Sequence, residues 1–337
     1  MRGDAMRKRP RIRTRCTLLS LAAPLLLAPA ACASDAGSSD DGGDDYPSES
    51  IRVIITFDPG GGSDTDFRRL QPHLEESLGV SLEPEYVTGA GGAIGWAELA
   101  NAEPDGYTIG TVVLPHILLQ PELIEDTGYE TSDFDIIGMN AYAPQILFVD
   151  AEDPAFESFD EFEAHVQENP GNVDIGGAAE YNLSHAVQVM LDDAGLDTNY
   201  VATGEGATAV VSGVRGGHYP VGITSIQQYF GAEDEIQPLA VSSEETYELA
   251  SDIPTLSELG YDVSGSTNWG LAAPEGTDPE KIEIISDAVA DALDEEDVLQ
   301  NMEDEGQGMI GTGPEESEEY VQDYLDDIRS VTPLFEQ

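Results

Sequence analysis

Three glycine-rich stretches of this 337-residue chain contain residues that could do chemistry on a small molecule. "DPGGGSDTD" (58–66), "TGAGGAIG" (88–95) and "GGAAEYNLSH" (176–185) each follow a β-like run, and a fourth small-residue loop lies at 203–207. Glycine lets backbone amides approach a ligand closely, and the N-terminus of a following helix favours negative charge. The stretches indicate that an anion binds where they converge, although for each of the first two alone a plain tight turn is an equal alternative.

Neither of the first two loops is a nucleotide signature. A Walker A loop needs a Gly-Lys-Ser/Thr ending, and no lysine follows either stretch. The dinucleotide fingerprint needs a glycine where Thr65 stands after Gly60 and Gly62, and where Ile94 stands in the second loop. We therefore expect no nucleotide and no cofactor.

Catalytic and metal-binding constellations are missing from the sequence. The five histidines lack the H-x-x-x-H spacing of a metal site, and there is no G-x-S-x-G elbow. Ser184 and His185 are neighbours in sequence, which does not make them a catalytic pair. We therefore expect a capture protein with no catalytic residue and no metal ligand. An exported enzyme acting on a carboxylated compound remains the alternative, supported only by the cleft and by these two residues.

The charge of the chain excludes some partners. It has 13 basic and 67 acidic residues, a formal net charge of −54. Seven of the basic residues lie in the first 31 positions with one acidic residue, which leaves 6 basic against 66 acidic residues, or −60, on the rest. Such a surface repels nucleic acid and anionic lipid. We interpret it as a halophilic acidic surface; the alternative, calcium binding, lacks a D-x-D-x-D-G loop.

The N-terminus is predicted to be an export signal. Residues 1–33 combine a basic segment, a short apolar run at 18–27 and small residues around Cys32, and the run is too short for a convincing membrane span. Residues 1–33 contain no adjacent Arg-Arg pair, which favours the general export route. Residues 34–49 are predicted to form a flexible acidic linker.

Cys32 is predicted to carry a lipid anchor. It stands at the junction of signal and linker, as in lipoproteins, but Pro29 replaces the leucine usual there. Ordinary cleavage around Ala31-Cys32-Ala33 is therefore the alternative. Cys16 lies inside the signal, so the mature body is expected to contain no disulfide.

From about residue 50 onward, strand-like runs alternate with helical periodicity, which predicts α/β layers. The first helix is expected to begin with Ser63 or Asp64 as N-cap, to end at Gly79, and to kink or split at Pro72. Residues 134–150 are expected to form two strands separated by a turn at 143–144. Ser158 and Glu161 predict a capping box, and Pro279 a helix start.

Longer blocks resemble a known family in the same order along the chain. They include "IRVIITFDPGGGSDTDFRRL", "GVSLEPEYVTGAGGAIGWAELANAEPDGYTIG", "DIPTLSELGYDV" and "NWGLAAPEGTDPEKIEII". Over roughly residues 50–330 the chain resembles the extracytoplasmic solute receptors of tripartite tricarboxylate transporters, the Bug family. Together the PGG-G-S-D, G-A-G-G, P-D-G-Y-T and W-G-L-x-A-P-x-G-T signals are specific, whereas each alone is weak.

The resemblance implies an α/β, two-lobed periplasmic-binding-protein fold of the Venus-flytrap, type II-like kind, with a central cleft and a hinge. Lobe 1 would comprise 50–148 and 262–337, and lobe 2 residues 149–261. The function implied is capture of a small carboxylated solute, as a monomer, and its delivery to large and small membrane permease subunits. The same fold also allows a ligand sensor for a membrane signalling protein.

The resemblance also implies the ligand-binding residues. By position they are Phe57, Gly61, Gly62, Ser63, Asp64, Ala90, Gly91 and Gly92 in the first lobe, and Glu180, Tyr181, Ser184, Thr203, Gly206 and Ser225 in the second. Asp64 is expected mainly to shape its turn.

The third loop departs from the family pattern. It has Glu180 and Tyr181 where small and hydroxyl residues are usual. The acidic residue suits a ligand with an amino or hydroxyl group at that end. Outside this loop, Thr224 stands where an aspartate is common. The ligand class stays open among di- and tricarboxylates, amino acids and aromatic acids.

Overall fold

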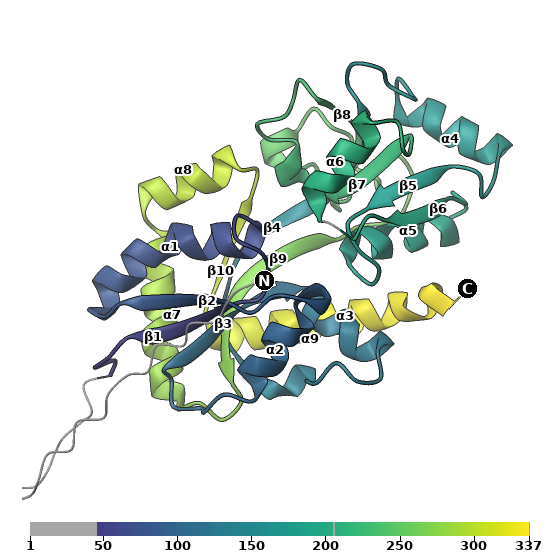
Figure 1. The fold of residues 1–337 in the computed structure, drawn as a ribbon. Coiled ribbons are helices and arrows are strands. Elements are labelled where there is room, and N and C mark those ends of the chain that lie inside the picture. Colours follow the sequence, from purple (N-terminus) through teal and green to yellow (C-terminus); the bar gives the residue numbers. More distant parts are fainter. Residues whose placement is uncertain (1–45, 205, 337) are drawn as a thin grey trace, which may run out of the picture. The chain divides into compact units, whose positions relative to one another are not determined.

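The computed structural model describes residues 46–204 and 206–336 (Figure 1). These residues all belong to one compact unit, Asp44–Gln337. The predicted signal, Cys32 and most of the predicted linker lie outside the described residues. In the described part of the chain, no helix is long and apolar enough to cross a membrane.

Strands and helices alternate, as the sequence predicted. The strands are β1 (Ile51–Ile55), β2 (Leu82–Tyr86), β3 (Thr108–Leu114), β4 (Phe134–Asp150), β5 (Asp174–Gly177), β6 (Asn199–Ala202), β7 (Val221–Ser225), β8 (Ile236–Val241), β9 (Ser266–Pro274) and β10 (Gly308–Thr312). The helices are α1 (Gly62–Leu78), α2 (Ala93–Ala100), α3 (His116–Leu123), α4 (Phe159–Glu168), α5 (Leu183–Asp193), α6 (Ala207–Arg215), α7 (Pro279–Leu293), α8 (Glu296–Asp304) and α9 (Pro314–Val331). Short 3₁₀ turns used below are η1 (Ala90–Gly92), η3 (Ile226–Gln228), η4 (Glu248–Ala250) and η5 (Thr332–Glu336).

One long strand, β4, belongs to two sheets. The strand order is β2-β1-β3-β9-β4-β7-β5-β6, with β8 and β10 also paired to β4. The first half of β4 pairs with β9 and β10, and its second half pairs with β7 and β8. The expected turn at Ala143-Pro144 is therefore wrong, because both residues continue the strand and pair with β9 at Thr267 and Ser266.

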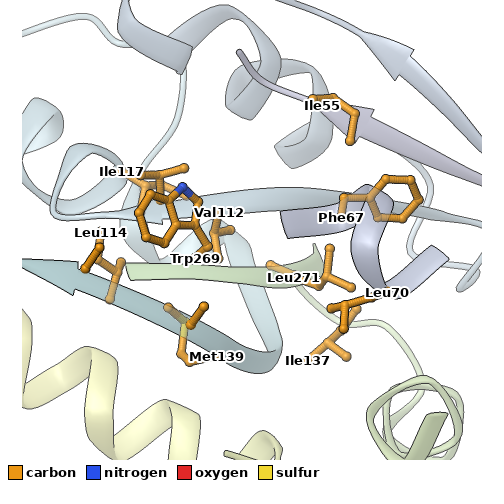
Figure 2. Close-up of a cluster of buried hydrophobic side chains, with 14 of the residues drawn as sticks. Ile55, Phe67, Leu70, Val112, Leu114, Ile117, Ile137, Met139, Trp269 and Leu271 are labelled. Carbon is orange, nitrogen blue, oxygen red and sulfur yellow. The ribbon is translucent and has the colours of Figure 1, made fainter. Parts of the chain in front are cut away.

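Each sheet has its own hydrophobic core. The larger core lies around β1, β3, β4 and β9 and includes Phe67 and Leu70 of α1, Ile137 and Met139 of β4, and Leu271 of β9 (Figure 2). The second core packs α4 and α5 against the other sheet, with Phe162 and Leu191 fully buried. Burial of such side chains contributes roughly 1.5–3 kcal/mol each and fixes the helices that carry the loops.

Helix α1 has a different N-cap from the one expected, and it does not split. Its N-cap is Gly61 rather than Ser63 or Asp64, and no side chain caps it. The helix continues through Pro72 to Leu78 without splitting. The end at Gly79 is confirmed: this glycine is left-handed, and its N–H donates to the Glu75 carbonyl at 3.1 Å.

Helix α4 has half of the predicted capping box. The Ser158 hydroxyl accepts from the Glu161 N–H at 3.4 Å, but the Glu161 carboxylate accepts from the N–H of Glu157 instead of Ser158. The predicted start of α7 at Pro279 is confirmed, with Asp278 as its N-cap. Three elements were not predicted, namely α3, α8 and β10; each is short, and α3 contains Pro121.

Candidate ligand-binding site

The N-terminus of α1 offers unoccupied hydrogen-bond donors. Gly61 has no side chain to cap the first turn, so no side chain of the described residues caps the amides of Gly62 and Ser63. Ser63 is 2% exposed, and its hydroxyl has no hydrogen-bond partner among the described residues. Because a buried polar group without a partner is costly, these donors indicate a site for a ligand oxygen.

Asp64 holds the turn before α1 in place. Its carboxylate accepts from the Gly60 N–H at 2.8 Å, from the Tyr86 hydroxyl at 2.8 Å and from Arg68 Nε at 3.2 Å. Burial raises the pKa of Asp64, but these hydrogen bonds outweigh it and the pKa is lowered. Asp64 is thus an ionised residue with its oxygens occupied, as a turn-shaping role requires.

The second glycine-rich loop is a left-handed turn. Gly89, Ala90, Gly91 and Gly92 have φ values of 124°, 50°, 64° and 100°. Gln120 supports the turn from α3, where its Nε2 donates to the Gly91 carbonyl at 2.9 Å. Side-chain donors thus take up carbonyl oxygens of the loop, and α2 begins after it without a side-chain cap. No local pattern indicated a role for Gln120, because α3 itself was not predicted.

Aromatic side chains join the first two loops. The Phe57 ring lies edge-on to Trp96, with centroids 5.9 Å apart, and to His116 at 5.8 Å. A Cβ atom on Gly92 would lie 2.6 Å from the Trp96 ring, so the glycine turn sits directly against it. Trp96 is itself fixed by donating its Nε1–H to the Thr111 carbonyl at 3.0 Å. Phe57 and Trp96 therefore form a wall shared by both loops.

The third loop is held in a strained conformation. Tyr181 has φ +55°, and its N–H donates to His185 Nδ1 at 3.3 Å. Burial lowers the pKa of His185 to about 4, so the imidazole is neutral at pH 7 and Nδ1 can accept. Asn182 caps α5 by accepting from the His185 N–H at 2.9 Å. Glu180 is exposed beside this arrangement.

The geometry excludes a Ser184–His185 catalytic pair. The Ser184 hydroxyl donates to Gln145 Oε1 at 2.7 Å, while the His185 Nδ1 accepts from the Tyr181 backbone. Gln145 also donates its Nε2–H to the Thr267 hydroxyl at 3.2 Å. Gln145, on β4, therefore links the start of α5 to β9, a role that sequence reasoning missed because the residue lies within an apolar strand.

Thr203 and Gly206 follow β6, and Ser225 is the last residue of β7; both strands pair with β5. Thr203 donates its N–H to the Gly177 carbonyl at 2.8 Å and its hydroxyl to the Ala178 carbonyl at 3.3 Å, which places it against the third loop. Gly206 starts α6 without a side-chain cap. Ser225 ends β7 opposite Gln145. The second-lobe residues expected to bind ligand thus follow the carboxyl ends of β5, β6 and β7.

Strand β9 brings the helices α1 and α5 together. A Cβ atom on Gly62 would lie 2.9 Å from the Trp269 indole, so the start of α1 rests on Trp269. The start of α5 is tied through Gln145 to Thr267, two residues earlier. Residues i and i+2 share one face of a strand and are about 7 Å apart. The start of α1 through Trp269, and the start of α5 through Gln145 and Thr267, are therefore both connected to one face of β9.

The side chains that lie close enough together to hold a metal ion are outside the glycine-rich loops. Within residues 46–204 and 206–336, the one such group is His73, Glu295 and Asp297. It lies between α1 and the start of α8, and none of its members belongs to the glycine-rich loops.

Two sheets that share β4, each with its own hydrophobic core, form the two-lobed α/β fold of periplasmic solute-binding proteins. Residues 67–332 match the sequence profile of the tripartite tricarboxylate transporter family receptor. The chain therefore belongs to this family, and it is an extracytoplasmic solute-binding receptor rather than an enzyme.

Similar proteins cover most of the chain. The UPF0065 protein in the gbd 5′ region of Cupriavidus necator is 27% identical over 254 residues, 74% of this chain and 76% of the relative. BugT of Bordetella pertussis is 25% identical over 293 residues, 84% of this chain and 88% of the relative. The crystal structure of a TctC solute-binding protein from Polaromonas is 26% identical, with a TM-score of 0.70, and the match covers 86% of this chain and 99% of that one.

Proposed function

We propose that this receptor captures a small carboxylated solute and delivers it to a membrane permease with a large and a small subunit. One observation carries the proposal: the uncapped start of α1, with the unpartnered hydroxyl of Ser63, lies on the same face of β9 as the start of α5. A ligand carboxylate would accept hydrogen bonds from the amides of the first two loops and from Ser63.

The proposed lobes are 50–148 with 262–337, and 149–261. Support comes from β4, whose two halves pair in different sheets, and from the separate hydrophobic cores. The ligand would lie between the lobes and draw them together, because both helix starts bind it only when they are close. Residues 1–33 would direct export and a lipid on Cys32 would tether the receptor, which we propose to act as a monomer.

A thermal-shift screen in about 2 M salt tests the proposal, with di- and tricarboxylates, amino acids and aromatic acids as candidates. A ligand that binds only the folded state raises the melting temperature by mass action. We expect a shift from at least one carboxylate, and expect it to be lost on replacing Ser63 with Ala. No shift from any carboxylate, with the protein folded by circular dichroism, would overturn the proposal.

A further inference from the structure

All the permanent cations of the body already have partners. Outside the first 31 residues the chain has six arginines and lysines, and all lie in the described part. They contact Glu85 and Glu98 (Arg52), Asp64 (Arg68), Glu305 (Arg69), Glu235 (Arg215), the Asp105 carbonyl (Lys281) and Glu122 (Arg329). Arg68 reaches the glycine-rich loops only through Asp64. A bound anion would therefore be held by amides and hydroxyls, without a free arginine or lysine.

The third loop is negative or neutral where the second end of a ligand would lie. Glu180 is exposed, and its charge helps to raise the pKa of the neighbouring Tyr200, which is raised mainly by burial. His185 is neutral, since burial lowers its pKa to about 4. Asn182 already caps the first turn of α5, in contrast to the uncapped α1. The two ends of the site thus differ in their capacity for negative charge.

Phe335 adds an aromatic surface to the third loop. It lies in η5, which follows α9 and contacts α5. Its ring is edge-on to His185, with centroids 4.8 Å apart, and 5.9 Å from Tyr181. The His185 ring also stacks on the Tyr200 ring, with centroids 4.3 Å apart. Tyr200 in turn donates its hydroxyl to the Ala179 carbonyl at 2.8 Å, so the stacked rings connect η5 to the loop.

From these observations we infer that the ligand carries one carboxylate, and that its other end is uncharged or cationic and lies against Tyr181, Phe335 and Glu180. A second carboxylate at that end would meet the Glu180 carboxylate with no positive group to offset the repulsion. Aromatic faces and a carboxylate suit an aromatic, aliphatic or ammonium group. The inference rests on the proposed function, and it narrows the ligand to monoanions and zwitterions.

Calorimetry in about 2 M salt with ligands of matched length tests the inference. The sets are pentanoate, 5-aminopentanoate and pentanedioate, and benzoate with benzene-1,4-dicarboxylate. We expect a monocarboxylate in at least one set to bind at least about tenfold more tightly than its dicarboxylate partner. Dicarboxylates binding as tightly or more tightly would overturn the inference while leaving the proposed function intact. No binding in any set would overturn the inference, whereas the proposed function would fail only if the full carboxylate screen were also negative.

Variants at two positions, Glu180 and Phe335, test the residues that carry the inference. Glu180→Gln should bind the dicarboxylate about tenfold more tightly, and Glu168→Gln, an exposed change at the end of α4, should not. Phe335→Ala should weaken the preferred monocarboxylate, and Phe335→Leu should weaken it less. If Phe335→Ala does not fold, the leucine variant and Glu180→Gln still decide. An unchanged dicarboxylate affinity in Glu180→Gln would contradict the charge argument.

Discussion

At the residue scale, a substitution of Ser63 should affect ligand affinity and the free energy of unfolding differently. Its hydroxyl is buried without a partner among the described residues, so Ser63→Ala should not lower the free energy of unfolding and should raise it by about 1 kcal/mol. A hydrogen bond to a charged group contributes about 1.5–3 kcal/mol, so the affinity for the ligand found in the screen should fall about 10- to 100-fold. Urea denaturation and calorimetry measure the two quantities.

Ser317 is the matched control for that change. It is also fully buried, but its hydroxyl lies 2.7 Å from the Thr312 hydroxyl. Ser317→Ala should therefore lower the free energy of unfolding by about 1 kcal/mol and leave the affinity unchanged. If Ser63→Ala behaved like Ser317→Ala, Ser63 would be a structural residue and not part of the ligand site.

His185 makes stability depend on pH. Its pKa is lowered by burial from 6.5 to about 4, so between these values the unfolded chain binds a proton that the folded chain does not. The contribution is fully present above about pH 6.5 and is lost as the pH falls toward 4. Protonation would also remove the acceptor for the Tyr181 N–H.

The measurement is urea denaturation at pH 7, 5.5 and 4.5. His185→Asn, which keeps a hydrogen-bond acceptor and does not titrate, should lose less stability between pH 7 and 4.5 than the parent protein. His218→Asn, a change at an exposed position, should follow the parent protein. If the free energy of unfolding depended on pH in the same way in all three proteins, folding would not lower the pKa of His185.

At the element scale, Arg69 fastens α1 to the turn between α8 and β10. Its side chain is 3% exposed, contacts Glu305, donates to Gln307 Oε1 at 2.5 Å and lies 3.6 Å from Asp66. In the same turn, the Gly306 carbonyl accepts from the Tyr247 hydroxyl at 2.9 Å, and Gly306 packs on Phe230. The turn therefore touches both the ligand-site helix α1 and the segments around η3 and η4.

Removing the charge of Arg69 should be costly for this reason. Arg69→Met leaves the buried Asp66 without its cation, which typically destabilises by about 3–5 kcal/mol. Asp66→Asn combined with Arg69→Met should recover part of that loss, because no buried charge remains between the two residues. Urea denaturation of both variants measures this; a double variant no more stable than Arg69→Met would show that the pair is not coupled.

Much of the order of elements could be predicted from the sequence, because apolar runs, Gly79 and Pro279 are local signals. The wrong predictions concern residues whose local structure is set by tertiary contacts. Ala143 and Pro144 continue β4 because β9 pairs with them, and a loop tip was expected only from the local presence of proline. Likewise, the glycine-rich loops were visible in the sequence, whereas Gln120, Gln145 and Phe335 reach them from elements distant in the chain. Long-range contacts of this kind leave no periodic pattern.

At the scale of the whole molecule, the acidic surface should make binding depend on salt. With a body charge of −60, an approaching anion is repelled over about 10 Å in 0.1 M salt but over less than about 3 Å in 2 M salt. Short hydrogen bonds to loop amides change much less over that range. We therefore expect affinity for the carboxylate ligand to be at least about tenfold higher in 2 M than in 0.1 M salt.

Calorimetry at both salt concentrations measures this, with circular dichroism to verify that the fold is intact. Equal affinity in 0.1 and 2 M salt, with the fold intact, would show that the long-range field does not reach the site. A comparison of sodium and potassium chloride at equal concentration should show little difference, because general screening depends on ionic strength.

The position of β9 has a consequence for how this chain becomes a receptor. The strand lies between β3 and β4, yet its residues, 266–274, are synthesised more than a hundred positions after β4 ends. The sheet that contains β3, β9 and the first half of β4 therefore cannot close until residue 274 has been made, and contacts so distant in sequence form slowly. A nascent chain that stays open in this way would be suitable for passage through an export channel, which is consistent with an extracytoplasmic receptor.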